Sequence, residues 1–309
     1  MRALLSSPSP PYVDLAEAPD PAPERHQALV EVKAFSLNRG ESRRLATMEP
    51  GSLTGWDVAG VVRAPAVDGS GPPAGARVVG MTHPYGAWAE LAAVSTDVLA
   101  ELPDAVSFEH AATLPVAGVT ALRALEVGGF VLGKRVLVTG ASGGVGRFAI
   151  QLAKLSGAHV TALARRTEGL SELGADEIIQ ELEPEGSPYE VIVDAVGGPT
   201  LGAAMGRIAP GGTIVNFAAT ADEPVSYPTR TLFSRAPGAR LYGLYVFTEL
   251  ARRGTGTSDL RRLAELVAAG KLDPQIHLVA PWTEAGSAIE ALLDRRVNGK
   301  AVLTVDGAR

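Results

Sequence analysis

The chain has 309 residues, a formal net charge of −6 and no cysteine, and 46% of its residues are hydrophobic. This length exceeds the usual size of one domain, so we expect two domains, or one domain inserted into another. The lack of cysteine excludes disulfides, thiolate nucleophiles and the common thiolate-rich zinc sites. An acidic chain without a long run of Lys and Arg is not expected to bind nucleic acid.

No segment predicts a membrane span or a secretory signal. The first fifteen residues carry one basic residue and only a brief apolar patch, which is too short for a signal-peptide core. The apolar stretch 111–122 is interrupted by Pro115 and Gly118, so it falls short of the length that crosses a bilayer. We therefore expect a cytoplasmic protein that does not contact a membrane.

The first third of the chain predicts a compact β-rich domain. Short runs rich in β-branched and apolar residues are separated by Pro and Gly, as in strands of a Greek-key or barrel-like arrangement. These runs are 28–37, 57–66, 76–81 and 87–94.

From about Val116 the pattern changes to alternating helices and strands, which is typical of a doubly wound parallel sheet. The predicted helices are 118–127, 144–157 and 201–210, and the predicted strands are 135–140, 159–164, 189–196 and 212–219. A further helix at 259–270 and a terminal strand at 299–305 follow. The fold class is therefore α/β.

The segment Arg135–Gly146, RVLVTGASGGVG, is a buried strand followed by a glycine-rich turn and a helix. Such a turn lets the backbone approach a pyrophosphate, and the helix start supplies N–H groups. Two families place glycines in this way. The short-chain dehydrogenases use a catalytic Tyr followed four residues later by Lys, but none of the six tyrosines has Lys at that position. We therefore favour the alternative spacing of Gly140, Gly143 and Gly146.

The strand after this turn indicates the cofactor. It ends at Ala164, and Arg165 and Arg166 follow where an NAD-binding site carries an acidic residue for the ribose. Two guanidinium groups suit a 2′-phosphate, so NADPH is the predicted cofactor. The alternative is that both arginines are only solvated loop residues.

Taken in order, these segments resemble the medium-chain dehydrogenase/reductase superfamily, and within it the zinc-independent quinone oxidoreductases related to zeta-crystallin. The segments that carry the resemblance are FSLNRGE, GWDVAGVV, GARVVGM, LPDAVSFEHAATLPVAGVTALRAL, VTGASGGVG, YEVIVDAVGG, GGTIVNF, LAELVAAGKL and NGKAVL. The resemblance implies a GroES-like catalytic domain formed by residues 1–117 and 247–309. It also implies a Rossmann NADP-binding domain at 118–246, inserted between them.

The resemblance also implies site residues. In similar enzymes Asn38 and Thr120 lie near the nicotinamide and its ribose, and Asn38 and Tyr85 are the candidates for catalysis. Asn38 is also a candidate for a purely structural role in its loop, and Tyr85 for simple packing. The implied cofactor-binding residues are Asn38, Thr120, Gly140, Ser142, Gly143, Gly144, Val145, Arg165, Arg166, Val196, Gly197, Phe217, Ala218 and Asn298.

The chain departs from its relatives in three places. Zinc-dependent relatives have Cys where this chain has Asn38 and Gly-His-Glu where it has Gly55–Asp57, so we expect no metal. Gln180 replaces a Tyr that helps to bind the 2′-phosphate in many relatives. The proton-donating Tyr of related polyketide enoyl reductases is replaced by Arg39.

The predicted function is reduction of quinones or α,β-unsaturated carbonyls by NADPH without a metal. The alternatives are an enoyl-thioester reductase of a biosynthetic pathway and a non-catalytic, crystallin-like NADPH-binding protein. We expect a small-molecule substrate. The resemblance also implies a homodimer, because the strands 211–217 and 241–247 would leave a sheet edge that relatives pair across a twofold axis.

Overall fold

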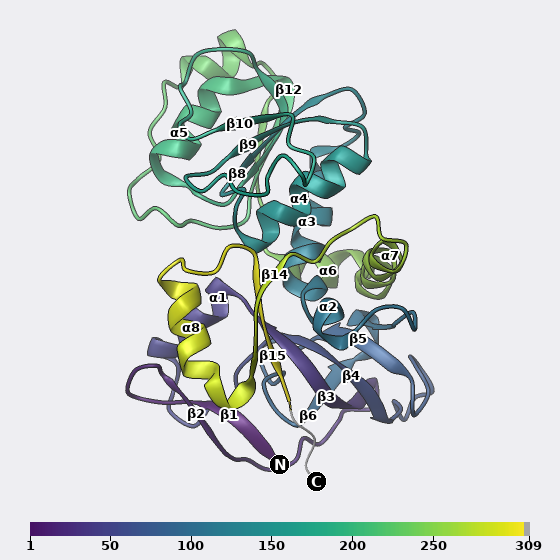
Figure 1. Ribbon diagram of the computed structural model, residues 1–309. Coiled ribbons are helices and arrows are strands. Elements are labelled where there is room, and N and C mark those ends of the chain that lie inside the picture. Colours follow the sequence, from purple (N-terminus) through teal and green to yellow (C-terminus); the bar gives the residue numbers. More distant parts are fainter. Residues whose placement is uncertain (306–309) are drawn as a thin grey trace. The chain divides into compact units, whose positions relative to one another are not determined.

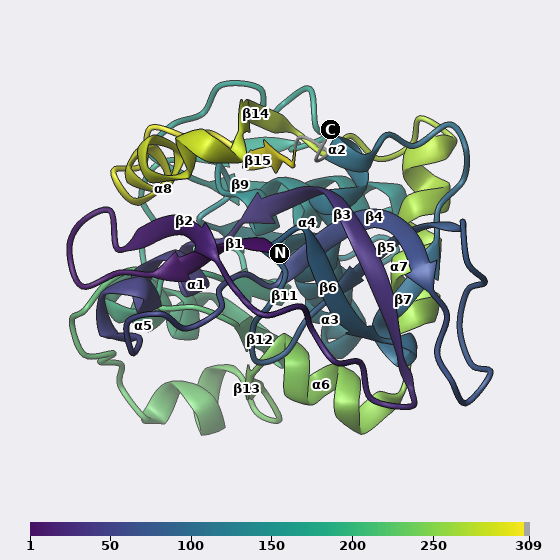
Figure 2. The ribbon, with the colours of Figure 1, turned by 90° about the horizontal axis from the view of Figure 1, so that it is seen from below.

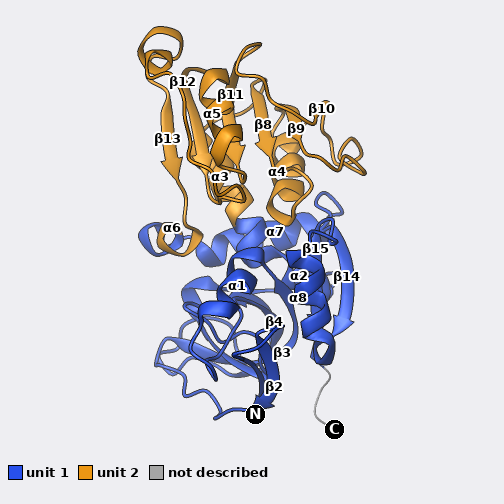
Figure 3. Ribbon diagram, turned by 90° about the vertical axis from the view of Figure 1, so that its left-hand side faces the viewer, with its two compact units in different colours: residues 1–119, 250–309 blue, residues 120–249 orange. Residues whose placement is uncertain are grey.

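The computed structural model describes residues 1–305, so the last four residues of the predicted segment 247–309 lie outside the described part. The chain forms two compact units (Figure 3). Unit 1 consists of Met1–Val119 and the segment that begins at Leu250, and unit 2 is Thr120–Glu249. Each unit is described by itself.

Unit 1 is built on a mainly antiparallel sheet (Figure 1). Its strands follow the order β14-β15-β3-β4-β5-β7, and β6 also pairs with β3, while β1 and β2 form a separate ribbon. The strands are β1 (Arg2–Ser6), β2 (Val13–Glu17), β3 (Gln27–Leu37), β4 (Asp57–Ala64), β5 (Arg77–Met81), β6 (Leu91–Ser95), β7 (Leu99–Glu101), β14 (Ile276–Pro281) and β15 (Lys300–Thr304).

The helices of unit 1 are α1 (Arg39–Arg44), α2 (Phe108–Ala112), α7 (Gly256–Ala268) and α8 (Ala285–Leu293). A π-helical turn, Leu114–Gly118, follows α2. Helix α8 packs beside β14 and β15 (Figure 2).

The long strand β3 joins the two chain segments of unit 1. Strand β15 pairs with the carboxyl half of β3, with Ala301 opposite Leu37, and β6 pairs with the amino half. This antiparallel register brings Lys300, the first residue of β15, beside the residues that follow β3. Segments almost the whole chain length apart therefore share one sheet.

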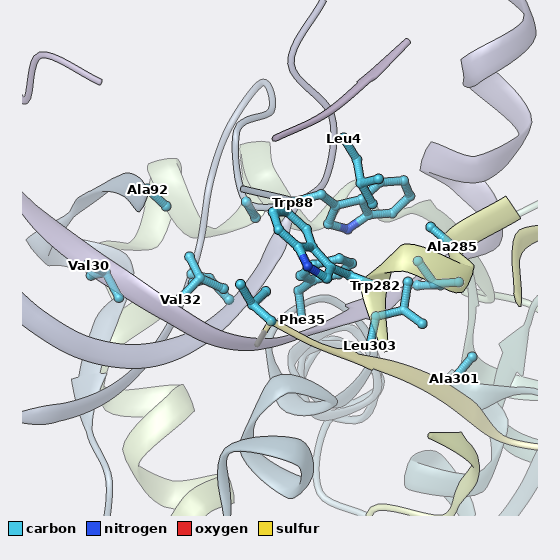
Figure 4. Packing of buried hydrophobic residues seen from close by; sticks show 14 of the residues in the cluster. Leu4, Val30, Val32, Phe35, Trp88, Ala92, Trp282, Ala285, Ala301 and Leu303 are labelled. Atoms are coloured by element: carbon cyan, nitrogen blue, oxygen red, sulfur yellow. The ribbon is translucent and has the colours of Figure 1, made fainter. Parts of the chain in front are cut away.

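Three aromatic rings hold the core of unit 1 together (Figure 4). Phe35 of β3 stacks on Trp88, with ring centroids 5.7 Å apart, and meets the edge of Trp282 at 6.5 Å. All three side chains are buried. Such ring pairs contribute about 0.5 to 1.5 kcal/mol beyond the burial of their area. Trp282 therefore ties the C-terminal segment to the first strands.

Unit 2 has a parallel sheet with the order β10-β9-β8-β11-β12-β13 among the described residues (Figure 3). Its strands are β8 (Arg135–Thr139), β9 (His159–Leu163), β10 (Glu177–Ile179), β11 (Tyr189–Asp194), β12 (Ile208–Asn216) and β13 (Arg240–Gly243). The helices are α3 (Val119–Gly128), which begins at the unit boundary, α4 (Gly144–Leu155), α5 (Gly198–Arg207) and α6 (Val246–Arg253), which spans the second boundary. The predicted α/β class with a parallel doubly wound sheet is confirmed.

The sequence patterns are wrong in some details. The predicted helix 201–210 ends earlier, because α5 stops at Arg207 and Ile208 begins β12; Pro210 cannot continue a helix. The structure adds elements that were not predicted, among them β10, β14 and α8. Strand β10 has only three residues, whereas α8 buries Ala285, Ala288, Ile289 and Leu292, a helical spacing that was visible in the sequence. The predicted strand 241–247 ends earlier, because β13 stops at Gly243 and Val246 begins α6. Strand β13 pairs with β12, which contains the predicted strand 211–217 and also pairs with β11. Only β13 of the two strands lies at the edge.

Among residues 1–305, no helix has both the length and the apolar character that a membrane span requires.

Candidate functional site

A buried aspartate organises one edge of the unit 2 sheet. Strands β8, β11 and β12 are parallel, so their last residues, Thr139, Asp194 and Asn216, lie at the same edge. The Thr139 hydroxyl donates to Asp194 Oδ1 at 2.5 Å, and the Asn216 amide donates to Asp194 Oδ2 at 2.8 Å. Asp194 has no exposed surface, and a buried carboxylate is stable only when such donors surround it.

The same carboxylate shapes the backbone that follows β11. The N–H of Val196 donates to Oδ1 at 3.3 Å and that of Gly197 to Oδ2 at 3.1 Å. The Asp194 carbonyl accepts from the N–H of Phe217 at 3.1 Å. Asp194 therefore holds three of the residues that the resemblance assigns to the cofactor. The sequence analysis missed it, although an acidic residue at the end of the apolar run YEVIVD was a visible signal.

The glycine-rich turn occupies the same edge. Gly140 has a φ of +61°, which favours glycine, and its carbonyl accepts from the N–H of Gly143 at 3.0 Å. Gly143 is the N-cap of α4, and no side chain caps this helix start. A Cβ on Gly146 would lie 2.6 Å from the Gly140 oxygen and 2.7 Å from the Ala141 Cα. The helix start therefore packs directly under the turn, an arrangement that suits a pyrophosphate.

A buried arginine links this turn to the loop after β9. Arg147 is 4% exposed. Its Nε donates to the Ser142 carbonyl at 3.3 Å, and its Nη2 donates to the Glu168 carbonyl at 2.7 Å. The sequence analysis missed Arg147 as well, although an arginine among the apolar residues of a predicted helix was an available signal.

Arg165 and Arg166 lie in the loop that Arg147 supports. Arg165 is exposed and Arg166 is half-buried. The side chain of Gln180 donates to the Arg165 carbonyl at 3.1 Å, so Gln180 supports the loop backbone. Two guanidinium groups close to the carboxyl edge of the sheet fit an anionic group of a bound nucleotide.

A second buried cluster lies at the start of α1 in unit 1. Asp57, the first residue of β4, is fully buried and accepts hydrogen bonds from the Ser36 hydroxyl, the Asn38 amide at 2.8 Å and the N–H of Val116 at 2.9 Å. The ammonium group of Lys300 lies 3.6 Å from Asp57 Oδ2. These donors come from three separate segments, because Ser36 and Asn38 lie only two residues apart.

This cluster fixes the orientation of the Asn38 amide. Its Nδ2 donates to Asp57 Oδ2 at 2.8 Å and to Glu41 Oε1 at 3.0 Å, while its Oδ1 accepts from Lys300 Nζ at 2.7 Å. A flipped amide would put oxygen against two carboxyl groups and the NH₂ against an ammonium. Both amide hydrogens are therefore used within the protein, and the oxygen is the part of the side chain with remaining capacity.

Burial sets the protonation of this cluster. It raises the pKa of Glu41 well above the ordinary value of 4.5, and the negative charge of Asp57 raises it further; hydrogen bonds from Asn38 and the charge of Lys300 offset part of this. Burial lowers the pKa of Lys300, against the opposing effects of Asp57 and Glu41. A protonated Glu41 leaves Asp57 and Lys300 as a balanced ion pair. Glu41 Oε2 is buried and has no hydrogen-bond partner within residues 1–305.

The other predicted residues lie next to these clusters or elsewhere in the two units. Tyr85 is half-buried in the loop after β5 and stacks on Trp56. Thr120 is buried in α3. Phe217 and Ala218 follow β12, and the Ala218 carbonyl accepts from Asn216 at 2.8 Å. Asn298 precedes β15, and its Oδ1 is buried without a partner in the described part of the chain.

Residues 1–305 contain no group of three or more His, Cys, Asp or Glu side chains that is arranged to hold a metal ion.

Comparison with known proteins places this geometry in a family. The family model described as zinc-binding dehydrogenase matches residues 173–303. A chloroplast envelope quinone oxidoreductase homolog of Arabidopsis thaliana is 30% identical over 93% of this chain and 92% of its own length. The chain belongs to the quinone oxidoreductase family of the medium-chain dehydrogenases/reductases. It is therefore an oxidoreductase with the two-domain fold of the alcohol dehydrogenase superfamily.

Two further similarities agree with this membership. The mitochondrial NAD(P)H oxidoreductase RTN4IP1 of Bos taurus is 32% identical over 81% of this chain and 70% of its own length. The solved structure of the quinone oxidoreductase from Coxiella burnetii has a TM-score of 0.83 and 28% identity, with 99% of both chains covered. The family uses a nicotinamide cofactor, and the glycine-rich edge of unit 2 fits one.

The close packing of Gly146 generates a prediction. We expect Gly146→Ala to weaken nicotinamide-cofactor binding and to cost about 1 to 3 kcal/mol of stability, because the methyl group would push the turn away from the helix start. Thermal unfolding and a cofactor titration would measure both effects. Gly243→Ala is the matched control, since its Cβ would meet nothing within 4 Å. Equal behaviour of the two variants would contradict the prediction.

The burial of Glu41 generates a second prediction. Because the pKa of Glu41 is raised in the folded protein, the folded state holds this proton more tightly than the unfolded chain. The free energy of unfolding should therefore fall as the pH rises above about 4.5, by at most about 1.4 kcal/mol per pH unit. Glu41→Gln cannot ionise and should lose less stability over the same range.

Denaturant unfolding of both proteins at several pH values between about 5 and 8 would test this expectation. The exposed Glu49 offers a matched control, and Glu49→Gln should keep the pH dependence of the parent. Parallel pH curves for the parent and Glu41→Gln would show that Glu41 is ionised in the folded protein.

Proposed function

We propose that this protein transfers hydride from NADPH to quinones and α,β-unsaturated carbonyls without a metal. The observation that carries the proposal is the carboxyl edge of the unit 2 sheet, where a glycine-rich turn, an uncapped helix start and two arginines meet. The family membership supports the reaction class. The substrate class is inferred from the names of the relatives and from the chemistry below.

We assign the cofactor to unit 2. Gly140, Ser142 and Gly143–Val145 would hold the pyrophosphate, and Arg165 and Arg166 the 2′-phosphate. Val196 and Gly197 would flank the adenosine side, while Phe217 and Ala218 would line the nicotinamide carboxamide. When bound, the nicotinamide supplies the hydride. In this assignment residues 118–246 form the NADP-binding domain, and residues 1–117 with 247–309 form the catalytic domain.

The chain's own groups must stabilise the negative charge that hydride addition puts on the substrate oxygen. Both Asn38 amide hydrogens are used by Asp57 and Glu41, so Asn38 contributes an acceptor oxygen and not a donor. Within residues 1–305 the hydroxyls of Thr120 and Tyr85 make no hydrogen bond to a protein group. We assign the donor role to these hydroxyls and to backbone N–H groups; one such donor in a dry site contributes about 3 kcal/mol.

Conjugated carbonyl substrates need only this modest stabilisation of the negative charge by hydrogen bonds. The enolate or hydroquinone anion that forms from an enone or a quinone delocalises its charge and can take a proton from water. A simple ketone would form a localised alkoxide, which requires stronger stabilisation such as a Lewis acid. This difference favours quinones and enones over unconjugated ketones.

The assembly and the location of the protein are also proposals. Strand β13 is an edge strand, and Leu241 on it is 53% exposed. An uncovered apolar edge favours pairing with a second copy, so we propose a homodimer. We also propose a cytoplasmic location, although two relatives are named for the chloroplast envelope and for mitochondria.

The reaction class predicts a substrate order. With NADPH, the protein should reduce 1,4-naphthoquinone and an enone such as 3-penten-2-one faster than the unconjugated ketone cyclohexanone, and a chelator should not change the rates. Cofactor oxidation followed by absorbance would measure this. Faster turnover of cyclohexanone would contradict the reaction class, and cofactor binding without any turnover would indicate a non-catalytic protein. A strong preference for enoyl thioesters would favour a biosynthetic enoyl reductase.

The arginine pair predicts the cofactor. We expect at least about a tenfold preference for NADPH over NADH, because loss of charge-assisted contacts to the phosphate costs roughly 1.5 to 3 kcal/mol. Replacement of Arg165 and Arg166 together by Ala should remove this preference with little effect on NADH. Arg63→Ala, at an exposed position of unit 1, is the matched control. Equal affinity of the parent for both cofactors would refute the assignment.

A further inference from the structure

Two aromatic rings form a layered stack in unit 1. The rings of Trp56 and Tyr85 are nearly parallel, with an angle of 7° between them and centroids 5.9 Å apart. Trp56 is buried, whereas Tyr85 is only half-buried. Within residues 1–305, Trp56 is the only ring that contacts Tyr85. One face of the Tyr85 ring is therefore covered by the tryptophan, and the side chain keeps accessible surface.

Several contacts hold Trp56, the buried ring of the stack, and the loop that carries Tyr85. The indole Nε1–H of Trp56 donates to the Pro84 carbonyl at 2.7 Å, so the tryptophan ties down the loop that carries Tyr85. The guanidinium carbon of Arg44 lies 5.6 Å from the Trp56 ring centre. The N–H of Gly86 donates to the carbonyls of Thr54 and Gly55, both at 3.1 Å. These contacts hold the backbone on either side of Tyr85, and Trp56 packs against its ring.

Tyr85 lies in a loop that is not closely packed at the next residue. A Cβ built on Gly86 would meet no atom within 4 Å. The Tyr85 side chain is only half-buried, unlike the fully buried rings of Phe35, Trp88 and Trp282 in the core.

The stack also lies next to the Asn38 cluster of the same unit. Trp56 directly precedes Asp57, which binds the Asn38 amide. A Cβ on Gly40, in the helix that Asn38 caps, would lie 3.3 Å from the Trp56 ring. The aromatic stack and the polar cluster are therefore one continuous feature of unit 1.

We propose that Tyr85 is a stacking platform for the planar ring of an aromatic quinone, and that its ring, not its hydroxyl, selects such quinones over open-chain enones. This inference rests on the proposed function and narrows its substrate class. A quinone ring is flat and electron-poor, whereas the face of a tyrosine ring is electron-rich, so offset stacking between them is favourable. An open-chain enone has no ring to stack.

The experiment compares three proteins: the parent, Tyr85→Phe, which keeps the ring, and Tyr85→Leu, which removes it. Equilibrium dialysis with 1,4-naphthoquinone in the presence of NADP⁺ measures binding without turnover. Steady-state kinetics with NADPH then give kcat and KM for 1,4-naphthoquinone and for 3-penten-2-one. Phe130→Leu, at a 74% exposed aromatic residue of unit 2, is the control for a general effect of losing a ring. Tyr85→Trp, with a larger ring, keeps the test decisive if the leucine variant unfolds.

We expect Tyr85→Leu to weaken naphthoquinone binding and raise its KM about fivefold, the size of one lost aromatic pair. Its KM for 3-penten-2-one should change less than about twofold. Tyr85→Phe and Tyr85→Trp should bind naphthoquinone as the parent does. Unchanged naphthoquinone binding by Tyr85→Leu would overturn the inference, and so would an equal loss in Tyr85→Phe, which would point to the hydroxyl. Ring-dependent binding by a parent that turns over neither substrate would support the platform and refute the proposed function.

Discussion

The cost of burying a carboxylate explains why distant segments converge at one point inside each unit. Asp57 and Asp194 are completely shielded from water, and such a group is tolerated only when donors replace its hydration. Each aspartate collects these donors from segments far apart in the chain. Asp57 draws on β3, the residue before α1, the π-helical turn and β15, and Asp194 draws on the ends of β8 and β12 and on the backbone after β11. In each case the groups brought together include residues assigned to the site.

The Asp57 cluster also shows how the C-terminal segment takes part in the site. Lys300 is the first residue of β15, and the pairing of β15 with β3 places its ammonium group against the Asn38 oxygen. Trp282 packs against Phe35 in the core of the same unit. The segment therefore does more than complete a sheet, because it supplies the cation that balances a buried carboxylate and orients an amide. Helix α1 adds Glu41, whose burial favours its neutral form.

Some parts of the site could be predicted from the sequence, because they depend on local constraints. The spacing of Gly140, Gly143 and Gly146 reflects a turn that must adopt positive φ and leave no room for a Cβ, and both properties are visible in residue types. The alternation of apolar strands and helices likewise predicts a parallel sheet. Asp194, Arg147 and the stack of Trp56 on Tyr85 were not predicted, because their roles depend on partners 21 or more positions away.

The sequence by itself determined the α/β class, the family and the identity of the glycine-rich turn, since each follows from periodicity, composition or short motifs. Tertiary structure decided the chemistry available to individual side chains. Asn38 could donate or accept as an isolated residue, and only the convergence of Asp57, Glu41 and Lys300 uses both of its amide hydrogens. The predicted strand 241–247 stops at Gly243, and only the strand pairing shows that β13, and not β12, forms the edge of the unit 2 sheet. Hydrogen-bond polarity and strand neighbours depend on contacts between distant residues, which local patterns do not encode.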